Sequence, residues 1–520
     1  MQFTVNNLFS DRLPADPNTE NSRRQVTKGY YSFVTPKKTK NPQLLHVSEE
    51  MLEALGISKE EAKSEEFLNV FTGNSILPKS NPYAMLYGGH QFGNWAGQLG
   101  DGRAINLFEI DHNEKHWALQ LKGAGETPYS RSADGLAVLR SSIREYLMSE
   151  AMHHLGVPTT RALSVALTGD SVLRDVMYDG NPAYEKGAVV CRVAPSFLRF
   201  GNFQIFTARN DIDGLQKLVD FTITNYFPQL GIPSKETYLK FFEEVAKRTL
   251  EMIIHWQRVG FVHGVVNTDN MSVLGLTIDY GPYGWLEGFE WGWTPNTTDR
   301  QHKRYRFGNQ PNIGLWNLYQ LANALYPLVE ESEGFEEILD AYKTDYAVKS
   351  LKMMSDKLGI VEAGEEDLKL IADLEECLQL VETDMTIFFR KLADYKKEDS
   401  VKGLQCIKEA FYTSEELNEE NTGKWENWFK NYSQRLQKDS QRDDARKAAM
   451  NRVNPKYVLR NYMAQLAIDA ADKQDYSLID TFYKMLKKPY DDQPEYEKWF
   501  AKRPDWARDK VGCSMLSCSS

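Results

Sequence analysis

Apolar and polar residues alternate in short runs through the first part of the chain and follow a helical period in the rest. Between about 65 and 215, β-type runs such as 117–122 and 187–193 are separated by glycine-rich turns. From about 216 onward helical periods dominate, for example from Tyr238 to Trp256. The pattern therefore predicts an α+β protein in which a sheet-rich lobe precedes a helical lobe.

Four segments are expected along the chain. Residues 1–64 are polar and broken by prolines, which predicts an extended N-terminal arm that wraps a neighbour. Residues 65–215 form the sheet-rich lobe, and residues 216–450 form the helical lobe. Residues 451–520 are a further helical extension, rich in aromatic residues, with a Cys-Ser-Ser tail. This is the layout of a two-lobed protein-kinase-like fold.

Composition narrows the class of protein. The net charge of -11 argues against a general nucleic-acid-binding role, which needs a basic field along the phosphate backbone. No uncharged apolar stretch reaches ~18 residues, so no membrane helix is expected. The N-terminus shows neither a secretory nor a mitochondrial pattern. Five cysteines form neither a disulfide framework nor a zinc motif, so we expect a cytoplasmic protein.

Two short motifs in the helical lobe carry the chemistry. His263-Gly264-Val265-Val266-Asn267-Thr268-Asp269-Asn270, followed by Asp279-Tyr280-Gly281, reads like the kinase motifs H-R-D-x-x-x-x-N and D-F-G. When Asn270 is aligned with the kinase Asn, the position of the catalytic base is Val265, which cannot accept a proton. The chain is then either an inactive kinase, or a protein that binds ATP and performs different chemistry with it.

The sheet-rich lobe contains a matching lysine. Lys122 ends an alternating run, as the phosphate-binding lysine of kinases ends a strand. Glu145, on a predicted helix, is the candidate for its ion pair, with Glu150 as the second choice. The glycine cluster between Gly88 and Gly102 is a weak signal by itself, because hairpin turns are the better explanation of such a cluster taken alone.

The resemblance becomes specific in the strings around these motifs. The chain resembles the selenoprotein O / YdiU family of kinase-like protein adenylyltransferases. The matching strings are Tyr87-Gly88-Gly89-His90-Gln91-Phe92-Gly93, Gly100-Asp101-Gly102-Arg103, residues 123–145, His263-Gly264, Asn267-Thr268-Asp269-Asn270-Met271-Ser272, Asp279-Tyr280-Gly281-Pro282 and the tail Cys518-Ser519-Ser520.

The resemblance implies an activity, in which AMP passes from ATP to Ser, Thr or Tyr hydroxyls of proteins, with UMP from UTP as the other possible transfer. It also implies that the nucleotide is reversed relative to kinases, and that Mg²⁺ or Mn²⁺ is required. A true kinase, acting on a protein or a small molecule, and a non-catalytic ATP-binding protein are the alternatives. Val265 argues against the kinase.

The resemblance further implies roles for single residues. Asp269 is expected to be the general base, Asn270 and Asp279 to hold the metal, and Glu145 to form the structural ion pair. Nucleotide contacts are expected at Gly100, Gly102, Arg103, Lys122, Asp134, Gly135, Arg192, Arg199 and Asp279. The four cations of this set suit a clamped pyrophosphate, because a reversed nucleotide brings its β- and γ-phosphates deep into the lobe.

Two further sets of residues carry weaker expectations. His153 and His154 show no second ligand pair, and are expected to be core or surface residues and not metal ligands. Cys518 suggests a redox latch, but residues 282–311 contain no partner cysteine. We therefore expect Cys518 to be dispensable for AMP transfer, and redox control to be weaker than in relatives with such a partner.

Overall fold

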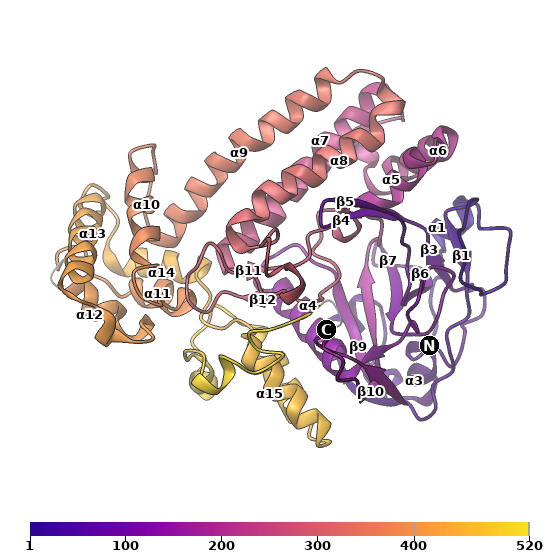
Figure 1. Ribbon diagram of the computed structural model, residues 1–520, viewed down its shortest axis with the longest axis horizontal. Coiled ribbons are helices and arrows are strands. Elements are labelled where there is room, and N and C mark those ends of the chain that lie inside the picture. Colours follow the sequence, from indigo (N-terminus) through magenta and orange to yellow (C-terminus); the bar gives the residue numbers. More distant parts are fainter. Residues whose placement is uncertain (400–401, 518–520) are drawn as a thin grey trace.

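A computed structural model describes residues 1–399 and 402–517, and combines a sheet-rich part with a long helical part (Figure 1). The strands are β1 (Tyr31–Phe33), β2 (Gln43–Val47), β3 (Tyr83–Met85), β4 (Gly88–Gln91), β5 (Asn94–Gln98), β6 (Ala104–His112), β7 (Lys115–Lys122), β8 (Ala137–Val138), β9 (Arg161–Arg174), β10 (Ala183–Ala194), β11 (Phe261–Val262) and β12 (Gly284–Trp285). The helices are α1 (Leu8–Arg12), α2 (Glu49–Ala54), α3 (Glu65–Phe71), α4 (Leu139–His154), α5 (Phe200–Ala208), α6 (Ile212–Tyr226), α7 (Lys235–Val259), α8 (Gln310–Val329), α9 (Glu333–Leu358), α10 (Asp367–Cys377), α11 (Met385–Leu392), α12 (Gly403–Ile407), α13 (Glu419–Gln437), α14 (Asp443–Val453), α15 (Asn461–Asp472) and α16 (Ser477–Leu486). The predicted α+β class is confirmed.

The main sheet is antiparallel and has the order β1-β3-β6-β7-β10-β9-β2, with β8 paired to β10. Its two end strands come from residues 1–64. Through these strands the N-terminal segment is built into the sheet of its own chain. The short pairs β4-β5 and β11-β12 lie outside the main sheet.

The register of β7 and β10 brings the cations of the site together. Gln120 lies opposite Arg192, and Lys122 lies opposite Val190. Because side chains alternate along a strand, Gln120, Lys122 and Arg192 point from the same face of the sheet. Helix α4 packs against β9 and β10 and presents Glu145 to this face.

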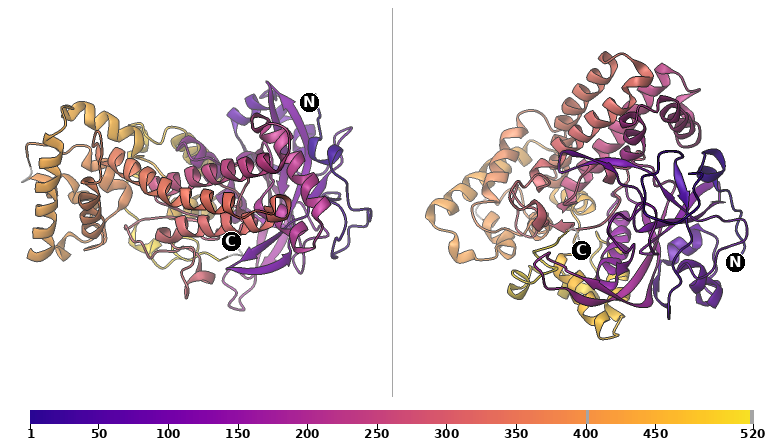
Figure 2. Two further views of the ribbon diagram at one scale, coloured as in Figure 1. Left: turned by 90° about the horizontal axis from the view of Figure 1, so that it is seen from above. Right: turned by 45° about the vertical axis from the view of Figure 1, so that its right-hand side comes forward.

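The helical part is built on α7, whose predicted core from Tyr238 to Trp256 is confirmed. Ser234 caps its first turn by accepting a hydrogen bond from the Thr237 N–H, and Gly260 ends it in the left-handed conformation. Helices α8 and α9 pack against α7. Helices α10 to α14 gather at the end of the molecule far from the sheet (Figure 2).

The C-terminal helices return to the sheet-rich part. Helices α15 and α16 pack against α4, and the Tyr483 hydroxyl donates to Ser48 across 3.1 Å. The last described residues then reach the loop that follows β12, where Leu516 exchanges backbone hydrogen bonds with Pro295 and Thr297. Within the described residues, no helix combines the length and the apolar character that crossing a membrane requires.

Candidate active site

The loop between β11 and β12 carries the kinase-like motifs. His263 is buried, and its Nε2 lies 2.9 Å from the carbonyl oxygen of Ile278, which ties the start of the loop to the residue before Asp279. Residues Thr268–Asn270 form a 3-10 turn that directs Asp269 inward. The side chain of His263 is therefore occupied in holding the loop.

Asp279 lies between two buried arginines. Arg199 Nη1 donates to Asp279 Oδ2 across 2.6 Å, and Arg192 Nη1 donates to Oδ1. Burial alone would raise the pKa of Asp279, but Arg199 and Arg192 hold it well below its ordinary range. Asp279 has a φ of 57°, in the left-handed region that aspartate seldom adopts. The packed surroundings hold this strained conformation.

Glu145 joins a third cation to the cluster. It accepts hydrogen bonds from Lys122 and, across 3.1 Å, from Arg192. Burial lowers the pKa of Lys122, and the carboxylate of Glu145 opposes that shift. Glu150 is engaged elsewhere, because it binds Arg161 across 2.7 Å. The structure therefore pairs Lys122 with Glu145 and not with Glu150.

Asp269 lies beside this cluster in a different environment. Gln91 Nε2 donates to Asp269 Oδ2 across 3.1 Å, while the buried Oδ1 has no hydrogen-bond partner in the described part of the chain. Burial raises the pKa of Asp269 to about 6, against the hydrogen bond from Gln91, which lowers it. A buried carboxylate oxygen without a partner is costly to keep, and such a group near charged neighbours is typical of a catalytic acid or base.

The β4-β5 hairpin covers the loop that carries Asp269. The N–H groups of His90 and Phe92 donate to Thr268 Oγ1 at 2.7 Å and Asn267 Oδ1 at 3.2 Å. A Cβ atom at Gly89 would lie 2.9 Å from Asp269 Oδ1, so glycine is required for this close approach. The backbone N–H groups of the hairpin therefore bind the loop that carries Asp269. Gln91 was not predicted as a site residue, although it belongs to one of the strings that carry the family resemblance.

The remaining predicted nucleotide residues lie on the turns around Lys122. Gly100 packs on the ring of Tyr129. The side chain of Arg103 forms no hydrogen bond or ion pair within the described residues. Gly102 approaches the Tyr129 backbone, where a Cβ would lie 2.9 Å from its carbonyl oxygen. Arg103 is close enough to Lys122 to lower the pKa of that lysine.

Asp134 and Gly135 lie farther from the charged cluster. The carboxylate of Asp134 forms two 2.8 Å hydrogen bonds with Arg174, and the carbonyl oxygen of Gly135 accepts from the Gly125 N–H across 3.0 Å. In this structure the two residues shape the loop before α4. No contact within the described residues joins them to Lys122, Arg192, Arg199 or Asp279.

The donor atoms near Asp279 fit a hard divalent cation. Asn270 Nδ2 donates to the carbonyl oxygen of Val265 across 2.9 Å, which leaves its Oδ1 as an oxygen ligand. Asp279 supplies a carboxylate that stays ionised beside its two arginines. Carboxylate and amide oxygens are the ligands that Mg²⁺ and Mn²⁺ prefer.

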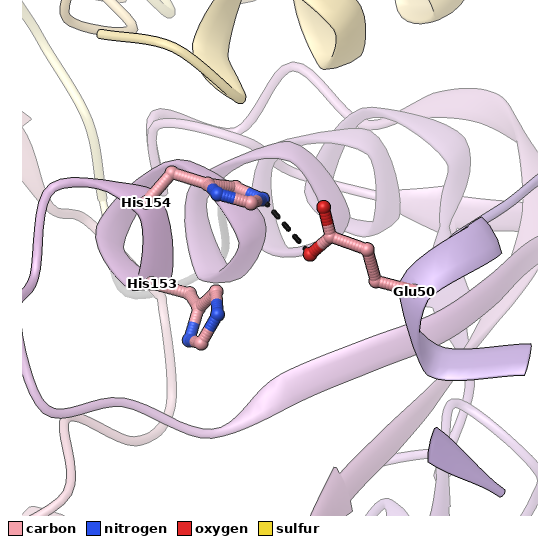
Figure 3. Close-up of side chains that lie close together, drawn as sticks. All are labelled: Glu50, His153 and His154. Carbon is pink, nitrogen blue, oxygen red and sulfur yellow. Dashed lines mark ion pairs between the residues drawn. The ribbon is translucent and has the colours of Figure 1, made fainter. Parts of the chain in front are cut away.

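A second cluster of metal-type side chains lies at the C-terminal end of α4. Glu50, His153 and His154 place their ligand atoms within 4.8 Å of one another (Figure 3). However, Glu50 already pairs with Lys487 at 2.9 Å and Arg161 at 3.1 Å. A cation bound there would be repelled by both positive groups, so we assign Glu50 to an ion-pair cluster.

The cysteines within residues 1–399 and 402–517 are all free thiols. Cys191, Cys377 and Cys513 are buried, and Cys406 is partly buried, all as free thiols. Burial raises the pKa of Cys513 to about 11, which keeps its thiol protonated. Cys518, the residue of the expected latch, lies outside the described residues.

Comparisons with known proteins agree with the motifs. The model of the family described as protein adenylyltransferase SelO matches residues 16–487. The chain is 63% identical over 517 residues to the protein nucleotidyltransferase YdiU of Flavobacterium johnsoniae, and the match covers 99% of both chains. It is 53% identical to proteins of the same name from Rhodopirellula baltica and Aromatoleum aromaticum, with 100% of this chain and 99% of each relative covered.

Proposed function

This chain belongs to the SelO family of protein adenylyltransferases, which makes it a protein nucleotidyltransferase, and we propose that it transfers AMP from ATP to Ser, Thr or Tyr hydroxyls. We further propose that its two parts form the lobes of a protein-kinase-like fold, with the nucleotide between them. The order of Lys122, Glu145, Asn270 and Asp279 along these lobes supports that arrangement.

One observation carries the assignment of the reaction, namely the unpartnered Oδ1 of Asp269. In a kinase the base would stand at the position of Val265, whose side chain cannot accept a proton. Asp269 lies next to Asn270 and its carboxylate is held at one oxygen only. We assign Oδ1 as the atom that accepts the proton of the attacking hydroxyl.

The cations fit a nucleotide bound with its β- and γ-phosphates inside. We propose that Arg192, Arg199, Lys122 and Arg103 bind these phosphates, so that the pyrophosphate is clamped as the leaving group. Guanidinium groups suit this task because each one donates two parallel hydrogen bonds to phosphate oxygens. In the absence of nucleotide, Asp279 and Glu145 pair with Arg192, Arg199 and Lys122 and offset part of their charge. Phosphate oxygens would replace the carboxylates as partners.

Asn270 and Asp279 are the residues that would hold Mg²⁺ or Mn²⁺. When bound, such an ion neutralises charge that develops on the phosphate oxygens during transfer. The Arg192 and Arg199 contacts keep Asp279 ionised, as a metal ligand must be.

The proposed step then balances without further reactants. The hydroxyl oxygen of the substrate attacks the α-phosphorus of ATP while its proton passes to Asp269 Oδ1. The bond from the α-phosphorus to the bridging oxygen breaks, and pyrophosphate leaves with the bonding electron pair. Arg192 and Arg199 stabilise the charge on that leaving group.

Replacing the base provides the experiment. We expect Asp269→Asn to reduce transfer from α-labelled ATP to proteins of a cell lysate by roughly a hundredfold or more. ATP binding should persist, because the Asp269 side chain accepts a hydrogen bond from Gln91 and not from the phosphate-binding cations. The contact of Arg199 Nη1 is with the backbone carbonyl oxygen of Asp269, at 2.8 Å, which the substitution keeps. In the wild type, initial rates should fall as the pH drops below about 6, because the carboxylate must be ionised to accept the proton. Transfer at the wild-type rate by folded Asp269→Asn would refute the assignment.

UTP is the alternative nucleotide, and competition between α-labelled ATP and α-labelled UTP decides between them. We also propose a cytoplasmic location, on the grounds that the described cysteines are free thiols.

A further inference from the structure

A short, strongly basic loop lies beside the catalytic loop. Between Asp299 and Phe307 the chain reads Arg300-Gln301-His302-Lys303-Arg304-Tyr305-Arg306, with four residues that are always cationic and one histidine. We refer to residues 300–306 as the basic loop. Such a run stands out in a chain with a net charge of -11. Most charge runs are simply solvated, so a binding role for this loop has to be argued from its position in the structure.

Asp299, the residue before the basic loop, fixes the backbone of that loop. The buried carboxylate of Asp299 accepts the N–H of Arg304 at 2.9 Å and the N–H of Tyr305 at 2.7 Å. This carboxylate is therefore directed at the backbone and leaves the basic side chains uncompensated. The only acidic side chain within 4.0 Å of them among the described residues is Glu290, at 4.0 Å from Lys303. Arg300, His302 and Lys303 are exposed.

The same loop is fixed to the loop that carries the proposed base. The Tyr305 hydroxyl donates to Asn267 Oδ1, and the Phe92 N–H of the β4-β5 hairpin donates to the Tyr305 oxygen across 3.0 Å. Asn267 lies two residues before Asp269. The basic side chains are therefore held beside the residue to which the acceptor hydroxyl must come.

The hairpin extends this surface with aromatic side chains. The guanidinium carbon of Arg304 lies 4.6 Å from the centre of the Trp316 ring and adjoins the hairpin turn at Gly93. His90 lies between Trp316 and Trp95, and the Trp95 side chain is 39% exposed although it is large and apolar. Exposed aromatic groups beside cations are typical of protein-binding surfaces.

These cations are separate from the ones proposed for the nucleotide. Lys122 and Arg192 are buried against Glu145 of α4, and Arg199 is buried against Asp279. By contrast, Arg300, His302 and Lys303 of the basic loop are exposed. The cations proposed for the triphosphate are therefore buried, whereas those of the basic loop are accessible to a protein.

We propose that the basic loop, together with Trp95, is a docking surface for an acidic segment of the protein substrate, next to the hydroxyl that is modified. This inference rests on the proposed function, because it names the chemistry of the acceptor at that site. The opposite charges of an acidic segment and this loop favour encounter and fix its register, while a basic segment would be repelled.

Two copolymers of opposite charge test this surface. Fluorescein-labelled Glu-rich and Lys-rich copolymers, each with tyrosine as the acceptor, serve as probes for binding by anisotropy and for transfer from α-labelled ATP. We expect the wild type to bind and modify the Glu-rich copolymer in preference, and added salt to weaken this binding. The KM for ATP should be the same with either copolymer.

Reversing the charge of the basic loop tests whether the preference for the Glu-rich copolymer comes from this loop. The double variant Arg300→Glu with Lys303→Glu should bind the Glu-rich copolymer about tenfold more weakly, with an unchanged KM for ATP. Replacing the same two residues by glutamine should give a smaller loss in the same direction. The matched control is Lys430→Glu with Lys438→Glu, which makes the same change in charge at exposed positions in and after α13, and should behave as wild type.

The outcomes separate this inference from the proposed function. Equal binding of the two copolymers by the wild type, or an unchanged preference in the reversed variant, would overturn the docking surface whether or not AMP is transferred. A weaker ATP affinity in the reversed variant, with copolymer binding unchanged, would assign the loop to the nucleotide and also overturn it. Absence of α-label on every protein of a lysate would instead overturn the proposed function, while the binding result would still stand.

Discussion

Two aspartates, ten residues apart, are given opposite properties by their neighbours. Asp279 is held between Arg192 and Arg199, which keep its pKa well below the ordinary range. Asp269 receives one hydrogen bond from Gln91, and burial raises its pKa to about 6. A pair of carboxylates whose pKa values are pushed apart supports the proposed roles, in which Asp279 stays charged and Asp269 exchanges a proton.

Replacing Asp279 tests the role proposed for the carboxylate that stays charged. We expect Asp279→Ala to lower AMP transfer by roughly a hundredfold or more, or ~3 kcal/mol, because both the metal ligand and its ionised charge are lost. Binding of ATP without a divalent metal should not weaken, because Arg192 and Arg199 no longer share their charge with a carboxylate. Labelled transfer and thermal shift with ATP measure the two effects.

Asp279→Ala should also destabilise the protein, because it removes one partner of an ionic cluster with buried arginines. ATP should recover part of the lost stability. Transfer near the wild-type rate by the folded variant would contradict the metal assignment.

At the scale of elements, the sequence predicted those that local pattern specifies. The alternating run up to Lys122 is β7, and the period from Tyr238 to Trp256 is the core of α7. Strands β1 and β2 were not foreseen, because three and five residues in a proline-broken segment gain their structure only by pairing with strands far along the chain. The contacts of the candidate site are limited in the same way, because some of them also join residues far apart along the chain.

The contact of Gln91 with Asp269 joins residues 178 positions apart, so no local pattern could predict it. Lys122 and Glu145 could be paired in advance, because the kinase-like motifs define both partners. The contact between the hairpin and the loop that carries Asp269 could be seen only in the folded structure.

The β4-β5 hairpin is therefore expected to position the base. Gln91→Met keeps the length of the side chain but removes the donor, and we expect kcat to fall about tenfold while the KM for ATP stays the same. The matched control is Asn94→Ala at the exposed start of β5, which does not contact Asp269. Steady-state kinetics measure kcat and the KM for ATP of both variants. A parallel change in KM for ATP, or an equal loss in the control, would show that the hairpin acts on the fold and not on the base.

At the scale of the whole molecule, the two ends of the chain enclose the helix that carries Glu145. Residues 1–64 complete the sheet at both edges, and α15 and α16 pack against α4 from the other end of the sequence. Helix α4 is thus held between the sheet and the C-terminal helices, which keeps Glu145 beside Lys122 and Arg192. In this cluster each cation already has a carboxylate partner, and under the proposed function phosphate oxygens would take the place of the carboxylates.

The most direct test of the central claim follows the two ends of ATP. Purified protein is incubated with a protein acceptor and either α-labelled or γ-labelled ATP, and the mass of the modified acceptor is determined. The account predicts that α-label alone is incorporated with the mass of one AMP, and that Val265→Asp does not change this outcome. Incorporation of γ-label by the wild type, or robust γ-phosphate transfer by Val265→Asp, would show that the nucleotide lies in the ordinary orientation and would contradict the account.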